Sequence, residues 1–272
     1  MLKKRVFTAV LLMTVLLLVL WSKSFPAFIL LTTLFFAGAI WEVFRLFDNR
    51  YPRLYAIFWT VFFGVVAFTV ARSMYFWIFS LCSVIWILYL VPSMMWELPE
   101  LRSPSDRVFE SMYSIAIFGG YSAILVLYRH SAIFLLSVLA VVWIADIGAY
   151  AAGRTLGKHK LAPSISPGKT WEGVIGGWLS VLVVATVSVT TLGLRDTLAP
   201  RLHGALGWGG LFLVLTIMVA LSILGDLLES KLKRRRDRKD SSSLLPGHGG
   251  VLDRMDSLIP VLPIAVLLDT WL

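Results

Sequence analysis

Residues 131–152 read SAIFLLSVLAVVWIADIGAYAA, an apolar stretch in which Asp146 is the one charged side chain. A helix of this length can cross a hydrocarbon core about 30 Å thick. A helix also satisfies its backbone hydrogen bonds internally, which lipid requires of any spanning element. The stretch therefore predicts a transmembrane helix, and Asp146 is a carboxylate that needs a partner within it.

Similar apolar runs recur along the chain, each ended by a short charged stretch. Hydrophobic residues make up 58% of the 272 positions and charged residues 15%, whereas soluble domains are about half apolar and a quarter charged. We therefore predict an all-α polytopic membrane protein with about nine transmembrane helices. The predicted spans are 6–21, 25–41, 55–71, 74–96, 108–128, 131–152, 172–194, 209–228 and 255–271.

The first span resembles a signal peptide, because three basic residues precede an apolar run that ends at Trp21. No small-residue cleavage motif follows it, so we predict an uncleaved helix. Cys82 is the single cysteine of the chain, which excludes an intrachain disulfide and a thiolate metal site.

Alternate loops differ in positive charge. One set holds 20 of the 25 lysines and arginines, and the other set holds Lys23, Arg72, Arg129, Arg195 and Arg201. Positive loops face the cytoplasm, so we predict a cytoplasmic N-terminus and an external C-terminus. The same bias accounts for the net charge of +9, and we expect no nucleic-acid partner.

Five carboxylates fall at the predicted cytoplasmic face, from three spans. They are Asp146, Asp226, Glu229, Asp253 and Asp256. The last two pairs have i, i+3 spacing, which places each pair on one side of a helix. Clustered carboxylates repel one another, and a hard cation such as Mg²⁺ removes that repulsion. In the alternative, Asp253 and Asp256 cap a helix and the other pair binds loop arginines.

Basic and glycine-rich segments complement these carboxylates. Lys169 lies in SPGKTWEG, just before a helix predicted to start near Thr170 or Trp171, which suits phosphate binding. The segment PGHGG contains His248, Gly249 and Gly250, and glycine lets backbone amides approach a phosphate. His248 either donates to phosphate or holds the turn. Most of the basic run 231–239 is interpreted as a solvated stripe attracted to anionic lipid.

These residues together describe Mg²⁺-dependent phosphoryl-transfer chemistry on a charged substrate at the inner membrane surface. No Walker-type phosphate loop is present, which argues against a P-loop ATPase. The alternative from another class is an ion- or proton-coupled transporter, since membrane carboxylates mark ion paths too. Transporters tend to have paired halves with broken helices, whereas the charges here crowd into the C-terminal half.

From Ser230 onward the chain resembles the signature of the phosphatidate cytidylyltransferases. The matching residues are Ser230, Lys233-Arg234, Lys239-Asp240, Ser242, Leu245-Pro246, His248-Gly249-Gly250, Asp253-Arg254 and Asp256. The resemblance continues upstream in GDLLES, LAPSISPGKTWEGVIGG and WIADIGAY, and so covers about the C-terminal half. The insert 235–238 departs from the family in being strongly basic and without glycine.

The resemblance implies transfer of CMP from CTP to phosphatidic acid, giving CDP-diacylglycerol and pyrophosphate. It implies a divalent metal, with or without a monovalent cation such as K⁺, and often a homodimer in a lipid membrane. Carried onto this chain, Asp226, Asp253, Asp256 and Lys169 are expected to be catalytic. The three aspartates are expected to organise the metal and the triphosphate, with Asp146 and Glu229 as supporting metal residues. Substrate phosphates are expected at Ser230, Lys239, Asp240, His248, Gly249, Gly250 and Arg254.

The resemblance also separates transmembrane helices in residues 1–130 from a catalytic region in residues 131–272 of one continuous membrane domain. A related cytidylyltransferase acting on another lipid phosphate remains an alternative, because apolar lining residues carry no readable code. The short N-terminus and the lack of appended domains favour a bacterial inner membrane, with the site facing the cytoplasm.

Overall fold

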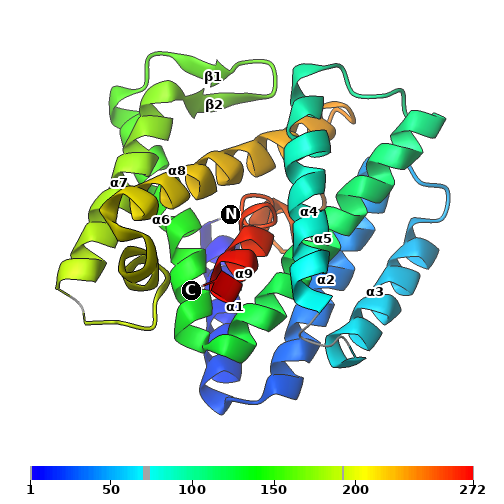
Figure 1. The fold of residues 1–272 in the computed structure, drawn as a ribbon. Coiled ribbons are helices and arrows are strands. Elements are labelled where there is room, and N and C mark those ends of the chain that lie inside the picture. The colour runs from blue at the N-terminus through cyan, green and yellow to red at the C-terminus, as the bar shows by residue number, and fades with distance from the viewer. Residues whose placement is uncertain (1, 70–73, 192, 272) are drawn as a thin grey trace.

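The computed structural model describes residues 2–69, 74–191 and 193–271, and it is built almost entirely of helices (Figure 1). The α-helices in these ranges are α1 Leu2–Ser22, α2 Phe25–Leu46, α3 Pro52–Thr69, α4 Tyr75–Ile85, α5 Pro104–His130, α6 Ala132–Leu156, α7 Trp171–Thr190, α8 Leu198–Arg234 and α9 Val261–Trp271. Two short helical segments, η2 (Trp86–Leu90) and η3 (Pro92–Met95), extend α4, and η4 (Leu252–Arg254) precedes α9. Arg72, residues 70–71 of the predicted span 55–71 and residue 192 of the predicted span 172–194 lie outside the described residues.

Seven helices of the described chain are long and apolar enough to cross a membrane, namely α2 to α8 with the extensions of α4 included. Two shorter apolar helical stretches, Val10–Ser22 and Val261–Trp271, accompany them. Each predicted span overlaps one of the helices α1 to α9, so the polytopic helical membrane fold is confirmed. The count of about nine spans and their direction through the membrane stay predictions.

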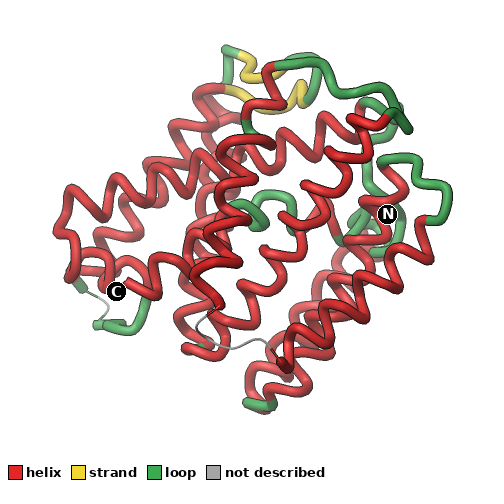
Figure 2. Tube along the Cα trace, turned by 45° about the vertical axis from the view of Figure 1, so that its right-hand side comes forward, coloured by secondary structure: helices red, strands yellow, loops and turns green. Residues whose placement is uncertain are grey.

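The connection between α6 and α7 contains the two β-strands of the described residues. Strand β1 (Lys160–Ala162) pairs antiparallel with β2 (Ser166–Thr170), with Lys160 opposite Thr170. Figure 2 shows this hairpin at one end of the helices. The predicted spans leave this segment as the connection between 152 and 172, and its Gly, Pro and Ser content masks the strand pairing.

The start predicted for the last span, residue 255, is wrong. The regular helix α9 begins at Val261, and turns and the short η4 occupy the preceding stretch. Pro260 explains the difference, since proline lacks an N–H donor and disfavours helical backbone in the residue before it. The spacing of Asp253 and Asp256 predicted that they share one face of the last helix. Both residues precede α9, so this prediction is wrong.

The buried core lies where α9 packs against α4 and α5, and where α2 packs against α3 and α5. Figure 1 shows α9 enclosed near the middle of the molecule, with α8 crossing obliquely beside it. Phe36 of α2 stacks on Phe63 of α3 at 4.6 Å between ring centroids. The core thus belongs mainly to the N-terminal helices, against which the C-terminal segments are placed.

Helices α6 and α7 pack backbone to backbone through small residues. A Cβ added to Gly176 would lie 2.2 Å from Ala152 Cβ, and one added to Gly177 would lie 2.5 Å from the Ala145 carbonyl oxygen. Small residues allow such close approach in lipid, where packing rather than the hydrophobic effect holds helices together. Glycine at 176 and 177 is thus what lets α7 approach α6 so closely.

Loops predicted to share the cytoplasmic face come together at one end of the helices. Arg235 pairs with Asp106 at 2.6 Å, and Arg236 pairs with Asp48 at 3.0 Å. Lys231 donates to the backbone carbonyls of Ser93 and Met94 in η3 and of Trp96 directly after it. The solvated-stripe interpretation of this basic run is therefore wrong for these residues, which tie the end of α8 to neighbouring loops.

The opposite end carries charges predicted to lie outside. Arg201 of α8 pairs with Asp269 of α9 at 2.9 Å, and His130 of α5 lies 3.0 Å from the same carboxylate. These contacts tie α5, α8 and α9 together at this end. The side of the membrane on which it lies stays a prediction.

Candidate active site

A cavity with both charged and apolar lining residues opens between α6, β2, α7 and α8. Its volume is about 530 Å³, and Asp146, Lys169 and Asp226 line it. Lys169 Nζ lies 2.7 Å from Asp226 Oδ2, with 24% and 30% of the two side chains exposed. We call this the Asp226 cavity. It brings together three of the predicted site residues, one each from α6, β2 and α8.

Lys169 is positioned by the junction between the β1–β2 hairpin and α7. Thr170 is the N-cap of α7, and its Oγ1 accepts a hydrogen bond from the Gly173 amide at 3.2 Å. Glycine at 153 and 157 leaves room for Thr170, whose Oγ1 is 3.1 and 2.9 Å from the Cβ positions that side chains there would occupy. The prediction of Lys169 immediately before a helix start is confirmed.

Thr170→Ala should lower the stability of the protein by about 1 kcal/mol, the usual effect of losing a side-chain cap. Turnover should fall several-fold with it, because Lys169 is the neighbouring residue of the strand. Thermal unfolding followed by tryptophan fluorescence, together with initial rates, measures both effects. Thr170→Ser keeps the cap oxygen and should restore both values; equal losses in Thr170→Ser would contradict this role.

Asp253 occupies a second, more enclosed cluster. Its carboxylate accepts from Lys233 Nζ at 2.7 Å, from the Ser241 amide at 3.0 Å and from the Gly250 amide at 2.6 Å. Lys233 also pairs with Glu229, whose side chain is fully buried. We call Glu229, Lys233, Ser241, Asp253 and Glu42, described below, the Asp253 network. Asp253 here organises a loop.

The ionisation of Asp253 follows from these contacts. Burial by itself raises the pKa of the carboxyl, but the hydrogen bond and charge of Lys233 and the Gly250 amide outweigh it and hold the pKa below its ordinary value. Donors that favour the charged form have this effect. Asp253 is therefore an anion at neutral pH, and its charge is compensated inside the protein.

Asp256 lies between the two clusters. Its Oδ1 accepts from the Ser257 amide at 2.8 Å, and its carbonyl oxygen would be 2.3 Å from a Cβ at Gly225, one residue before Asp226. The carboxylate is near enough to Asp226 and Glu229 to interact with both electrostatically. Glycine at 225 is thus what allows the Asp256 segment to contact α8.

Glu42 of α2 is the functional-site residue that sequence reasoning missed. It is fully buried, and its carboxylate accepts from the Val251 amide at 3.0 Å, the Leu252 amide at 2.7 Å and the hydroxyls of Ser241 and Ser242. The predicted span 25–41 ended one residue before it. A carboxylate continuing an apolar helix is the signal that could have found it.

The remaining predicted residues lie around this loop. Ser230 donates to Asp226 at 3.3 Å, whereas Lys239 and Asp240 are exposed. The His248 carbonyl accepts from Arg254 at 2.5 and 3.1 Å, and the imidazole Nδ1 is buried without a hydrogen-bond partner among the described residues.

The glycines of the PGHGG segment have structural tasks. Gly249 has a φ of +86°, which favours glycine. A Cβ on Gly250 would lie 1.9 Å from Ser241 Oγ and 2.4 Å from Glu42 Oε1. The amides at 250–252 bind Asp253 and Glu42, so the loop directs these donors at protein carboxylates.

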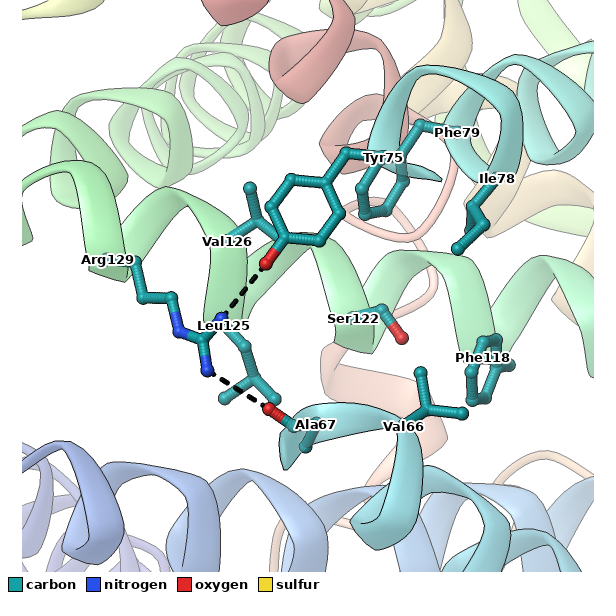
Figure 3. A pocket seen from close by; sticks show the side chains of 10 residues that line it. All are labelled: Val66, Ala67, Tyr75, Ile78, Phe79, Phe118, Ser122, Leu125, Val126 and Arg129. Atoms are coloured by element: carbon teal, nitrogen blue, oxygen red, sulfur yellow. Dashed lines mark hydrogen bonds between the residues drawn. The ribbon is translucent and has the colours of Figure 1, made fainter. Parts of the chain in front are cut away.

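A further cavity lies near the C-terminal end of α5, between α3, α4 and α5, and is much smaller than the Asp226 cavity (Figure 3). Its volume is about 30 Å³, room for about one or two waters. Arg129 crosses its edge and donates to Tyr75 Oη at 2.9 Å and to the Ala67 carbonyl at 3.1 Å. This cavity is too small for a nucleotide, and its arginine holds α3, α4 and α5 together.

Metal binding is favoured by the donor chemistry of the Asp226 cavity. Asp146 and Asp226 offer oxygen ligands to one space, the ligand type that Mg²⁺ prefers. Within residues 2–69, 74–191 and 193–271, no three His, Cys, Asp or Glu side chains are grouped closely enough to hold a metal by themselves. Water or substrate phosphate oxygens would therefore have to complete the coordination, as is usual for Mg²⁺.

The chain is similar to proteins of one known family. The profile described as "Cytidylyltransferase family" matches residues 3–271. A phosphatidate cytidylyltransferase of Haemophilus influenzae is 48% identical over 140 residues, 49% of this chain and 44% of that protein. Proteins of the same name from Pseudomonas aeruginosa and Bacillus subtilis are 45% identical over 131 residues and 46% identical over 123 residues.

The aligned stretches cover 48% and 45% of this chain for the last two relatives, and 45% and 42% of those proteins. The chain thus aligns with less than half the length of the curated relatives that it matches. The profile, by contrast, extends over nearly the whole sequence. This chain belongs to the cytidylyltransferase family.

Proposed function

We propose that the protein transfers CMP from CTP to phosphatidic acid, giving CDP-diacylglycerol and pyrophosphate. The observation that carries the proposal is the Asp226 cavity, where Lys169 lies 2.7 Å from Asp226 beside Asp146. The names of the relatives point to the same reaction. Membership of a cytidylyltransferase family favours this transferase over the transporter alternative.

The reaction needs positioning and charge compensation more than proton transfer. A phosphatidate oxygen attacks the α-phosphorus of CTP, the bond from that phosphorus to the β-phosphate bridge breaks, and pyrophosphate leaves in line. The attacking phosphate is already anionic near neutral pH, because its second pKa is about 6. A strong general base is therefore unnecessary.

The residues of the cavity divide these tasks. Lys169 supplies a cation to the phosphates, and Asp226 orients the ammonium group through their ion pair. Asp146 and Asp226 would hold Mg²⁺, which when bound offsets phosphate charge. Asp256 connects this cavity to the Asp253 network, which holds Arg254 and the His248 turn in place. Preorganised charge of this kind stabilises the transition state.

The proposal is tested by pyrophosphate release from the purified full-length chain in mixed micelles. With CTP, phosphatidic acid and Mg²⁺ together we expect release, and omitting either substrate should abolish it. Asp256→Asn should reduce release strongly, because it changes the carboxyl group that lies between the two clusters. Release with another lipid phosphate but none with phosphatidic acid would assign the protein to a related transferase instead.

Removing divalent metal should abolish release and adding it back should restore it. EDTA is the reagent, followed by titration of Mg²⁺ and, separately, of K⁺. The expected response is saturable in Mg²⁺, since the Asp226 cavity offers two carboxylates. Full activity in excess EDTA would refute the metal requirement and leave the transfer reaction standing.

The Asp226 cavity is further proposed to face the cytoplasm of a bacterial inner membrane. The support is the charge of the surrounding loops, since positive loops remain on the cytoplasmic side, and the bacterial source of the relatives. Two further predictions from the family resemblance are a homodimer and a division of the chain at residue 130. The mass of the detergent-solubilised particle measures whether the protein is a dimer.

A further inference from the structure

A second large cavity differs from the Asp226 cavity in being almost wholly apolar. Its volume is about 390 Å³, within the range of small-molecule sites. Side chains of α1, α2, α5 and α6 form its walls, and the segment 245–258 closes one end. We call it the apolar slot; Leu16, Thr32, Tyr121, Leu139, Trp143 and Met255 are among its lining residues.

Helix α1 covers the slot and is tied to the loop that closes it. Five of its residues, between Leu12 and Leu20, line the cavity. Thr8 Oγ1 donates to the Pro246 carbonyl at 2.9 Å. The slot is thus bounded by the N-terminal helix on one side and by Leu245 and residues of the stretch 254–258 at its end.

The guanidinium group of Arg254 lies at that closed end. Arg254 lines the slot, is exposed, and is oriented by its two hydrogen bonds to the His248 carbonyl at 3.1 and 2.5 Å. An apolar cavity with a fixed guanidinium at its end matches an amphiphile that has a hydrocarbon chain and an anionic head. Free nucleotide would leave the apolar walls without a partner.

Tyr121 gives independent evidence for a ligand. Its side chain is 1% exposed and lines the slot, yet its hydroxyl has no hydrogen-bond partner among the described residues. Buried hydroxyls almost always have a partner. An ester carbonyl of a lipid chain in the slot would accept a hydrogen bond from it.

The slot also lies next to the Asp226 cavity. Helix α6 borders both, with Trp143 facing the slot and Asp146 facing the cavity. These residues are three apart, about one helical turn. A lipid with its chain in the slot therefore has its head group held at the level where the carboxylates lie.

From these observations, the structure assigns the apolar slot to one acyl chain of phosphatidic acid, with the phosphate at Arg254. The identity of the lipid rests on the function proposed above. Lipid tails are as apolar as the slot, so the slot selects by shape and by its arginine rather than by hydrophobic driving force. The slot then determines the length of the acyl chain that the site accepts.

Leu139→Trp, which fills the slot, is the test. The KM for dioleoyl phosphatidic acid should rise about tenfold, while the KM for CTP and the rate with dihexanoyl phosphatidic acid, whose chains are too short to reach the filled region, stay at wild-type values. Leu213→Trp is the matched control: Leu213 lies 62% exposed on α8 and should tolerate the change. An unchanged KM for the dioleoyl lipid in Leu139→Trp would overturn the assignment.

Binding without turnover separates this inference from the proposed function. Native mass spectrometry in detergent should show dioleoyl phosphatidic acid retained by the wild type in preference to phosphatidylcholine, and lost from Leu139→Trp. Retention of the lipid by a wild type inactive with CTP would reject the proposed reaction and keep the slot. Equal retention by wild type and Leu139→Trp would reject the slot whatever the activity.

A second variant keeps the slot testable if Leu139→Trp fails to fold. Tyr121→Phe leaves the size of the side chain almost unchanged and removes the buried hydroxyl. The wild type should retain ester-linked over ether-linked phosphatidic acid several-fold, and Tyr121→Phe should abolish that preference. An identical preference in both proteins would overturn the contact between the hydroxyl and the lipid.

Discussion

Asp226→Asn should lower the rate of pyrophosphate release by about 10²–10³-fold, the effect of removing one preorganised electrostatic group from an active site. The amide keeps the shape of the side chain but removes the charge that orients Lys169 across 2.7 Å. It also removes one of two carboxylates of the cavity. Initial rates at saturating CTP and phosphatidic acid, over a titration of Mg²⁺, measure the loss and any weakening of metal dependence.

Asp196→Asn is the matched control for this substitution. Asp196 lies at the opposite end of the helices, 3.1 Å from His130, so the same chemical change there should leave the rate unaltered. A rate for Asp226→Asn within about threefold of wild type, with the same Mg²⁺ dependence, would remove Asp226 from the site.

Glu42→Ala should destabilise the protein by about 3–5 kcal/mol and abolish activity with it. The carboxylate accepts from two buried backbone amides and two serine hydroxyls, and truncation leaves the amides buried without partners. The loop that carries Asp253 and Arg254 would then lose its attachment to α2. Thermal unfolding in detergent, with pyrophosphate release measured below the transition, reports both effects.

Two comparisons give the Glu42 result its meaning. Glu42→Gln keeps one acceptor oxygen and should lose about half as much stability, by the usual value of single hydrogen bonds. Glu100→Ala removes an exposed carboxylate and should change neither property. Glu42→Ala with wild-type unfolding and turnover would show that the loop holds its shape without α2.

The two clusters of carboxylates have different physical roles, although the sequence presents them as one group. Asp226 and Asp146 face a cavity large enough for a ligand, whereas Asp253 and Glu229 share Lys233 in a buried network. Removing one partner of a buried pair leaves an uncompensated charge. Changes at Asp253 should therefore affect stability and activity together, and changes at Asp226 mainly activity.

The sequence by itself determined the helices and the segments in which the candidate site residues lie. Apolar runs of membrane-spanning length and the alternation of basic loops are local properties, visible without contacts. The position of Lys169 just before α7 is equally local, since Gly168 and Thr170 are its neighbours. The irregular turns between Asp253 and Val261 were missed because the apolar pattern continues through Pro260.

Only the tertiary structure decided how the charges are shared. Glu42 meets its partners 199 to 210 residues away in the chain, and no periodicity of residue type encodes a contact at that separation. The choice of Asp226 for the cavity and of Glu229 for the buried network depends on which neighbour α8 meets at each turn. The same holds for the apolar slot, whose walls come from four helices and a loop that share no sequence pattern. Local chemistry settles where a helix forms, whereas the packing of helices decides which carboxylates line a cavity and which are buried in ion pairs.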